Sequence, residues 1–355
     1  MSLKKIFYPG LILTFAVSAL AHYMHLGGPT TQFGLSALAI LFAAGFMGKA
    51  TESVAHYAGD RMGGFLNATF GNAAELIIAI FLIKEGLFDM VKASLTGSII
   101  GNLLLVLGLS LLAGGIKFKE QRFNALLASH NASLMILGVI ALFIPAMFLF
   151  EFGENSSKME TLSLVVSALL IIAYVLWLLF SMITHKKELS EQVETQPDHG
   201  ESPVWSAKIS VLFLALSTVM VAFISEWMVG TLESFSTQYG LSELFVGAFL
   251  VAIVGNAAEH SAAIMLAYKG KIGAAVEIAV GSSLQIALFV SPVLVFISFF
   301  GGNPMDLVFM PVELVAIAVS VFIAKSISQD GSTNWFEGAL LLIVYLILGV
   351  AFYLI

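Results

Sequence analysis

Hydrophobic residues in this chain of 355 residues fall in long continuous runs separated by short polar segments. A helix needs about 20 consecutive apolar residues to cross a bilayer, whereas strands of a membrane barrel show shorter alternating patterns. The pattern therefore predicts an all-α polytopic membrane protein with about 11 transmembrane helices. The predicted spans are 6–25, 33–50, 63–83, 93–115, 123–149, 160–184, 206–229, 241–268, 272–300, 305–327 and 335–355.

Composition narrows the class of protein further. Hydrophobic residues make up 59% of the chain and charged residues only 11%, against about 25% charged in soluble domains. The chain has no Cys, which excludes disulfides and thiolate metal sites. The net charge of −7 comes without a basic patch, so we expect the lipid bilayer and not nucleic acid as a partner.

Basic residues predict the orientation of these spans. With the predicted boundaries, all but three of the 16 Lys and Arg residues fall on the side of the N-terminus; the exceptions are Lys84, Lys92 and Lys158. Cytoplasmic loops carry such an excess of Lys and Arg. We therefore expect an integral membrane protein with a cytoplasmic N-terminus. The short N-terminal tail favours a prokaryotic plasma membrane.

A repeated motif divides the chain into two halves. Gly-Asn-Ala-Ala-Glu occurs at 71–75 and again at 255–259, and Gly-Ser follows each Glu at the same spacing, at 97–98 and 281–282. Five predicted spans separate the two copies. Because five is an odd number, the copies must cross the membrane in opposite directions, as in the inverted repeats of many secondary transporters.

The predicted organisation is therefore two inverted five-helix repeats plus one extra N-terminal helix. The extra helix occupies 1–30, the first repeat 31–184 and the second 206–355. Between the repeats lies an acidic segment, 185–205, which we expect to be a cytoplasmic linker.

The repeated motif carries the candidate chemistry. A carboxylate at bilayer depth costs about 2.5–3.5 kcal/mol on insertion scales, so Glu75 and Glu259 at matched positions indicate a function. Asn72 and Asn256 each stand three residues before a Glu and share its helix face. Carboxylate and amide oxygens are hard ligands that suit Ca²⁺, and two Glu balance its charge. Burial disfavours an ionised carboxylate and a bound cation favours it, so cation and proton compete for the same oxygens.

Further residues extend the candidate site. Gly71 and Gly255 precede the motif face, where a helix break would free backbone carbonyls for a cation. We expect the polar residues of the fourth and ninth spans to line the cavity: Ser98, Asn102, Ser282 and Gln285. Asn102 has no counterpart in the second half, because Ile286 occupies that position, and its alternative role is packing.

Three more residues are candidates for gating or for the entrances. His260 follows Glu259 but lies about 100° around the helix, so it either tunes proton coupling or serves packing. Glu52 and Glu226 stand at the predicted ends of the second and seventh spans, where acidic side chains collect cations. Ordinary interfacial charges are the alternative interpretation for both.

The paired motifs, with Gly-Asn-Ala-Ala-Glu-His-Ser at 255–261 in the second copy, resemble those of the Ca²⁺/H⁺ exchanger (CAX) family of the calcium/cation antiporter superfamily. The resemblance extends over nearly the whole chain. It implies Glu75 and Glu259 as the central Ca²⁺ and H⁺ residues, and Ser282 and Gln285 as lining. Na⁺/Ca²⁺ exchangers of the superfamily carry hydroxyl residues and a proline before the Glu. Alanines occupy those positions here, which argues against Na⁺ coupling.

The predicted function is Ca²⁺/H⁺ antiport by alternating access, with Ca²⁺ as transported substrate and no cofactor. The alternatives are exchange of another cation, either Mn²⁺ or coupled to Na⁺, and a cation channel. An intramembrane enzyme is disfavoured, because the sequence contains neither His-Glu-x-x-His nor a Ser/His nucleophile pair. A homo-oligomer is compatible with the sequence, which does not fix the oligomeric state.

Overall fold

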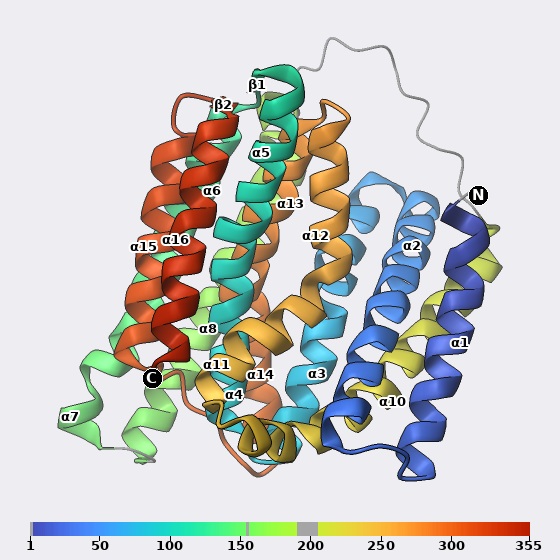
Figure 1. Cartoon of the computed structure of the whole chain (residues 1–355). Coiled ribbons are helices and arrows are strands. Elements are labelled where there is room, and N and C mark those ends of the chain that lie inside the picture. Colours follow the sequence, from blue (N-terminus) through green and yellow to red (C-terminus); the bar gives the residue numbers. More distant parts are fainter. Residues whose placement is uncertain (1–2, 154–155, 190–204) are drawn as a thin grey trace.

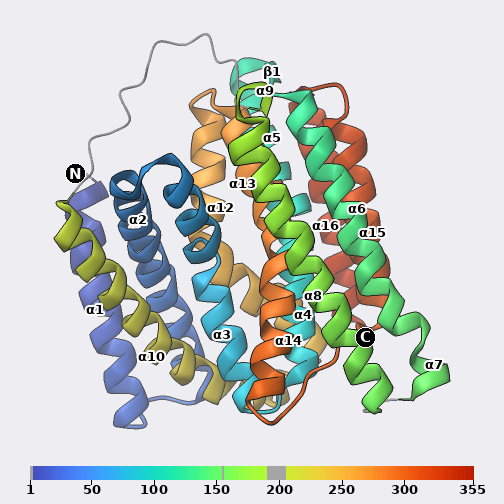
Figure 2. The same ribbon diagram turned by 180° about the vertical axis from the view of Figure 1, so that it is seen from behind.

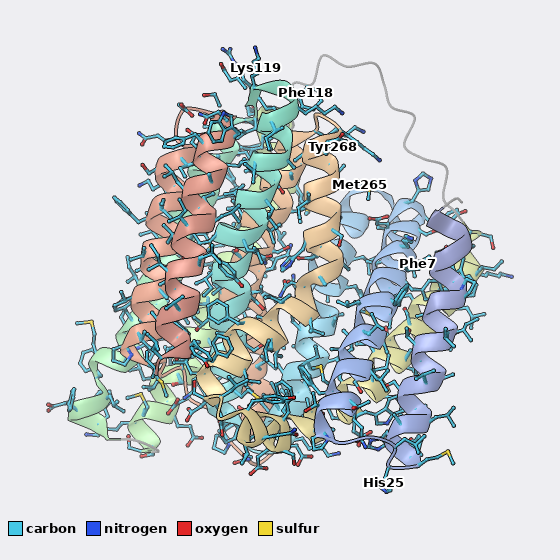
Figure 3. All side chains as sticks on the ribbon, in the orientation of Figure 1. Phe7, His25, Phe118, Lys119, Met265 and Tyr268 are labelled. Carbon is cyan, nitrogen blue, oxygen red and sulfur yellow. The ribbon has the colours of Figure 1, made fainter. Side chains whose placement is uncertain are left out.

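A computed structural model describes residues 3–153, 156–189 and 205–355. Most of the predicted acidic linker, 190–204, lies outside the described residues. Figure 1 shows a bundle of long helices that run roughly side by side. We call the edge where the N-terminus, Lys119 and Tyr268 lie the upper edge, and the opposite edge, where His25 lies, the lower edge (Figures 1 and 3).

Long apolar runs form the helices, and most of their bounds lie within a few residues of the predicted spans; α2, α3 and α10 depart from them. The elements before the linker are α1 Leu3–Tyr23, α2 Pro29–Phe70, α3 Ala73–Lys84, α4 Phe88–Ile100, η1 Gly101–Val106, α5 Leu107–Phe118, β1 Glu120–Arg122, α6 Ala125–Met147, α7 Leu149–Phe152, α8 Ser157–Leu179, η2 Phe180–Thr184 and α9 Lys186–Leu189. Here η denotes a π-helical segment.

The elements after the linker are α10 Ala207–Tyr239, α11 Glu243–Phe245, η3 Val246–Val251, α12 Ala252–Tyr268, α13 Ile272–Gln285, η4 Ile286–Val290, α14 Ser291–Phe300, α15 Pro311–Ser328, β2 Ser332–Asn334 and α16 Trp335–Tyr353. The segments η1 and η4 fall at matching places in the two halves. Single π-turns of this kind often occur at functional sites.

The predicted count of 11 spans is not fully confirmed. Within the described residues, nine helical segments are long and apolar enough to cross a membrane, and the apolar part of α1, Phe7–Tyr23, is shorter. The remaining predicted span, 63–83, is divided between two helices. The ribbon of α2 reaches the upper edge, turns over and descends toward α3 (Figure 2).

The two motif glycines differ in backbone structure. The predicted break at Gly71 is present, because α2 ends at Phe70 and α3 begins at Ala73. The corresponding break at Gly255 is wrong, since α12 runs through this position without interruption. The irregular backbone of the second half comes earlier, in η3, so Gly255 itself keeps regular helical hydrogen bonds.

The helices pack as two groups. Helices α1, α2 and α10 lie together on one side in both views, with α2 packed along α1 and α10 (Figures 1 and 2). The other long helices form the second group, in which α13 contacts α5, α6 and α12. Helix α12 lies between the groups. It contacts α2 of the first group and the short helix α3, and it also contacts α4, α5 and α13.

The two motif helices run in opposite directions. From the middle of the bundle, α3 descends to the lower edge, whereas α12 rises to Tyr268 at the upper edge (Figure 1). This antiparallel arrangement agrees with the odd number of spans between the motif copies. The domain boundaries proposed for the repeats stay a prediction.

Candidate functional site

The two motif copies meet in the middle of the bundle. Glu75 and Asn72 are buried, with 6% and 1% of their surface exposed, and Asn256 is 1% exposed. Glu259 is partly buried. Glu75 packs directly against the other copy, since a Cβ placed on Gly255 would lie only 3.2 Å from Glu75 Cγ. Gly255 therefore contributes space for the carboxylate of the opposite repeat.

Each motif asparagine bonds to the half of the chain that does not contain it. Asn72 Nδ2, from the first half, donates to Gln285 Oε1 in α13. Asn256 Nδ2, from the second half, donates to Ser98 Oγ in α4 at 2.8 Å. Asn102 Nδ2 donates to Asn256 Oδ1 at 3.4 Å. These bonds join the two halves at the level of the candidate site.

Ser282 completes the set of predicted lining residues. Its hydroxyl donates to the carboxylate of Glu259, the motif residue of the same half. All four predicted lining residues thus bond to a motif Asn or Glu. Asn102 is completely buried and bonds to a motif residue even though the second half has no equivalent of it.

Several oxygens of the site have no hydrogen-bond partner among the described residues. They are both carboxylate oxygens of Glu75, Oε2 of Glu259, and the Oδ1 atoms of Asn72 and Asn102. Leaving a buried polar atom unsatisfied costs about 1–3 kcal/mol, and such atoms are rare in folded proteins. A cluster of acceptors without donors is the arrangement expected of a site that takes up protons or a cation.

No group of three His, Asp or Glu residues suitable for a metal is present in the described part of the chain. A cation held here would therefore rely on two carboxylates together with amide oxygens. This ligand set suits a hard cation that tolerates flexible geometry.

The three candidates for gating and entrances have different surroundings. His260 is 9% exposed, and its Nε2 has no hydrogen-bond partner among the described residues. Glu52 is exposed, and its predicted position at a helix end is wrong, because α2 continues to Phe70. The predicted position of Glu226 at a helix end is wrong, because α10 continues to Tyr239 and stops only where Gly240 adopts a left-handed conformation. Glu226 is exposed and lies 3.9 Å from Lys84 Nζ.

The upper end of α12 is fixed by the last turn of α5 and by strand β1. Lys117 Nζ donates to the carbonyl of Tyr268 at 2.8 Å, and Gln121 Nε2 donates to the carbonyl of Ala267 at 3.3 Å. Figure 3 shows Phe118 and Tyr268 close together at the upper edge. Strand β1, which carries Gln121, pairs antiparallel with β2, so the end of α12 is tied to the α15–α16 connection.

One buried acid was missed in the sequence. Glu313 is 2% exposed; its Oε1 accepts from Thr96 Oγ1 at 3.2 Å and its Oε2 from the backbone N–H of Met310 at 2.8 Å. Together with Asp89 and Glu243 it lines a cavity of about 230 Å³. An acidic residue inside the predicted span 305–327 was the available signal. Both oxygens of Glu313 have partners, as expected for a residue that stabilises the start of α15.

Comparison with known proteins gives matches over nearly the whole chain. The family model described as sodium/calcium exchanger protein matches residues 29–183 and 209–354. The Ca²⁺/H⁺ antiporter ChaA of Bacillus subtilis (strain 168) is 47% identical over 99% of this chain and 100% of its own length. The Ca²⁺/H⁺ antiporter of Aphanothece halophytica is 46% identical over 99% of this chain and 97% of its own.

Solved structures give the same result for the fold. The structure of native YfkE superposes with a TM-score of 0.85 at 44% identity, covering 99% of this chain and 100% of that one. The crystal structure of the H⁺/Ca²⁺ exchanger CAX has a TM-score of 0.76 at 14% identity, covering 99% and 92%, which shows a shared fold. The all-α polytopic fold and the resemblance to these exchangers are thereby confirmed.

Proposed function

Because the chain belongs to the sodium/calcium exchanger protein family, we propose that it is an antiporter that exchanges Ca²⁺ for H⁺ across a membrane. Family membership makes it a secondary transporter and not an enzyme. One observation carries the proposal: Glu75 and the Glu259 helix come from oppositely directed copies of one motif and meet in the bundle, with carboxylate oxygens that no described donor satisfies. The relatives named Ca²⁺/H⁺ antiporters support the choice of ions.

The proposed cation site combines the two carboxylates with amide oxygens. Glu75 and Glu259 together neutralise a divalent cation, and the free Oδ1 atoms of Asn72 and Asn102 add neutral ligands. Ca²⁺ takes six to eight oxygens at flexible geometry, so water would complete its shell. Asn256 has both amide atoms engaged, which suits a role in holding α12 against α4.

Proton coupling follows from the same carboxylates. With the cation absent, two negative charges in a buried site repel one another and lack a counter-charge, which favours protonation. Arrival of Ca²⁺ displaces those protons, and their return releases it. Exchange then requires only that the site changes sides when it is loaded with Ca²⁺ or with protons, and not when it is empty.

Na⁺-coupled exchange is the second candidate, since the matching family is described as sodium/calcium exchangers. Alanines at 73–74 and 257–258 offer no hydroxyl beside the two Glu, which disfavours an additional Na⁺ site. Mn²⁺ would use the same hard ligands as Ca²⁺ and is separated from it only by competition measurements.

We place the N-terminus and the upper edge in the cytoplasm. The Lys and Arg bias of the predicted loops supports this orientation. Nine described helical segments of membrane-spanning length and the bacterial relative support a prokaryotic plasma membrane as the location.

The decisive experiment measures Ca²⁺ flux in proteoliposomes with an imposed pH gradient and no Na⁺. We expect uptake into acid-interior vesicles that a protonophore abolishes and that Glu259→Gln eliminates. Glu160→Gln, an acid in the first turn of α8 outside the site, serves as the matched control. Uptake that requires internal Na⁺ would instead support Na⁺-coupled exchange. Absence of Ca²⁺ flux under both gradients would refute the proposed substrate.

A further inference from the structure

Helix α13 has one incompletely buried stripe along an otherwise buried surface. The positions that are not fully buried recur every three or four residues, so they share one helix face. We call them the α13 stripe: Gly273, Ala274, Glu277, Ile278, Gly281 and Gln285. The stripe starts near the upper edge and ends at Gln285, which accepts the hydrogen bond from Asn72 in the candidate site. It therefore leads from the edge of the molecule to the site.

Most of the equivalent face of α4 is covered. Of the six residues that stand 184 positions before the members of the stripe, five are buried, at 90, 93, 94, 97 and 101, and only Asp89, near the start of α4, is exposed. Segment η3 packs against this face so closely that a Cβ on Gly97 would lie 1.9 Å from the carbonyl oxygen of Ala248. A Cβ on Gly281 would meet no heavy atom within 4 Å. The stripe is thus open where its repeat equivalent is closed.

The composition of the stripe fits water better than lipid. Glu277 is exposed, although its helix α13 contacts α5, α6 and α12. An ionised Glu facing hydrocarbon would cost several kcal/mol. Small and polar residues make up the remaining stripe apart from Ile278. The first-half counterpart of Glu277 is Ala93, which is fully buried.

We infer that the α13 stripe is the wall of the cation's approach from the upper edge to the two-Glu site, and that Glu277 is the carboxylate at its mouth that attracts the cation. The inference rests on the proposed function for the identity of the cation. Glu277 would act through its field, by raising the local cation concentration before binding. Since the field of one charge is screened within about 8 Å at physiological ionic strength, the expected effect is a few-fold change that salt weakens.

A labelling experiment tests the approach path without transport. The chain has no Cys, so Gly281→Cys introduces the one thiol, at a position with room for the side chain. Positively and negatively charged methanethiosulfonate reagents of equal size are added to each side of oriented vesicles. We expect labelling only from the side of the N-terminus, faster with the positive reagent, and a ratio of the two rates that falls about threefold or more when Glu277→Gln is added.

Two results would overturn the inference. Resistance of Gly281→Cys to both reagents from the N-terminal side would show that the stripe is not a water-filled path. An unchanged rate ratio after Glu277→Gln would remove the role of its charge. Glu233→Gln is the control, because Glu233 is an exposed acid near the C-terminal end of α10 and not part of the stripe. It should leave the rate ratio unchanged. Because both reagents sample the same thiol, a mere change in accessibility cancels in the ratio.

Transport then links the stripe to the substrate. With Ca²⁺ on the N-terminal side, Glu277→Gln should raise KM about threefold to tenfold and leave kcat unchanged, and the difference should disappear at high salt. With Ca²⁺ on the opposite side, KM should not change. A loss of kcat, or an equal change from both sides, would contradict steering at one mouth. Failure of the unsubstituted protein to exchange Ca²⁺ would refute the proposed function instead, and the labelling result would stand apart from it.

Discussion

The same Gly-Ser pair of the two repeats has opposite surroundings. Gly97, in α4, lies against the backbone of Ala248 with no space for a side chain, whereas Gly281, in α13, faces open space. Their neighbours also differ, since Ser98 bonds to Asn256 and Ser282 to Glu259. Two matched sequences thus occupy one closed and one open environment. If the proposed exchange works by alternating access, a state with access on one side only would have such an asymmetry.

The largest effect should come from substituting Glu75 or Glu259. We expect the same effect for both, although the surroundings of the two repeats differ. Glu75→Gln and Glu259→Gln each keep the size of the side chain and remove the charge that both cation and proton need. We expect either variant to lose Ca²⁺/H⁺ exchange by at least about 100-fold while folding normally, measured as flux in proteoliposomes and by gel filtration. Substantial exchange in one of the two would show that the halves do not share the site equally.

The glycines should reveal the asymmetry in stability. Gly97→Ala forces a Cβ into backbone atoms of η3, and overpacking of this kind costs about 1–3 kcal/mol or more. Gly281→Ala has room, so it should change stability by less than about 0.5 kcal/mol or raise it through its better helix propensity. Thermal unfolding in detergent measures both. Equal losses of stability would mean that α13 is as tightly covered as α4.

Proton competition should act on the two halves together. Protonation of Glu75 and Glu259 removes the negative charge that holds Ca²⁺, so apparent affinity should fall as pH falls on the side of binding. Each displaced proton changes affinity by up to about tenfold per pH unit. Ca²⁺ titrations between pH 5 and 8 follow this, with each Glu→Gln variant as a control that should flatten the dependence. A constant affinity in the intact protein would contradict direct competition.

The least separated pair of variants should be the two serines, whose expected losses lie next to one another. Ser282→Ala removes a donor from a carboxylate, and hydrogen bonds to charged groups contribute about 1.5–3 kcal/mol. Ser98→Ala leaves Asn256 with its bond to the Ala252 carbonyl at 2.9 Å, so the loss should be about 0.5–1.5 kcal/mol. Apparent Ca²⁺ affinity at one pH compares them. A larger loss for Ser98→Ala would contradict the ranking of these two hydrogen bonds.

The motif residues of the site could be predicted from the sequence, because they occur at matching positions in both halves. Glu75, Asn72 and their counterparts are expensive in a membrane and occur twice, which makes a structural coincidence improbable. The bond from Asn72 to Gln285, by contrast, joins residues 213 positions apart. Helix periodicity places each residue on a face of its own helix and carries no information about which other helix that face meets. The exchange of asparagine contacts between halves could therefore not be foreseen.

The sequence also gave wrong predictions for a helix break and a helix end, because contacts with distant residues decide the backbone conformation at those positions. Gly71 and Gly255 are each followed by Asn-Ala-Ala-Glu, yet only the first interrupts its helix. Glu226 follows a long apolar run and suggested a helix end, but α10 continues to the left-handed turn at Gly240. Propensity is a weak guide at such positions because packing and capping partners far away in sequence outweigh it.

The sequence by itself determined that the protein is helical and built for a membrane, and that the two motif copies run in opposite directions, because apolar run length and a repeated motif can be read directly along the chain. Only the tertiary structure decided which helix faces meet and which repeat is closed. The reason is physical: both repeats carry surfaces that are able to pack, and a close contact such as Gly97 with Ala248 depends on the relative position of distant helices. The open stripe that carries Glu277 exists for the same reason.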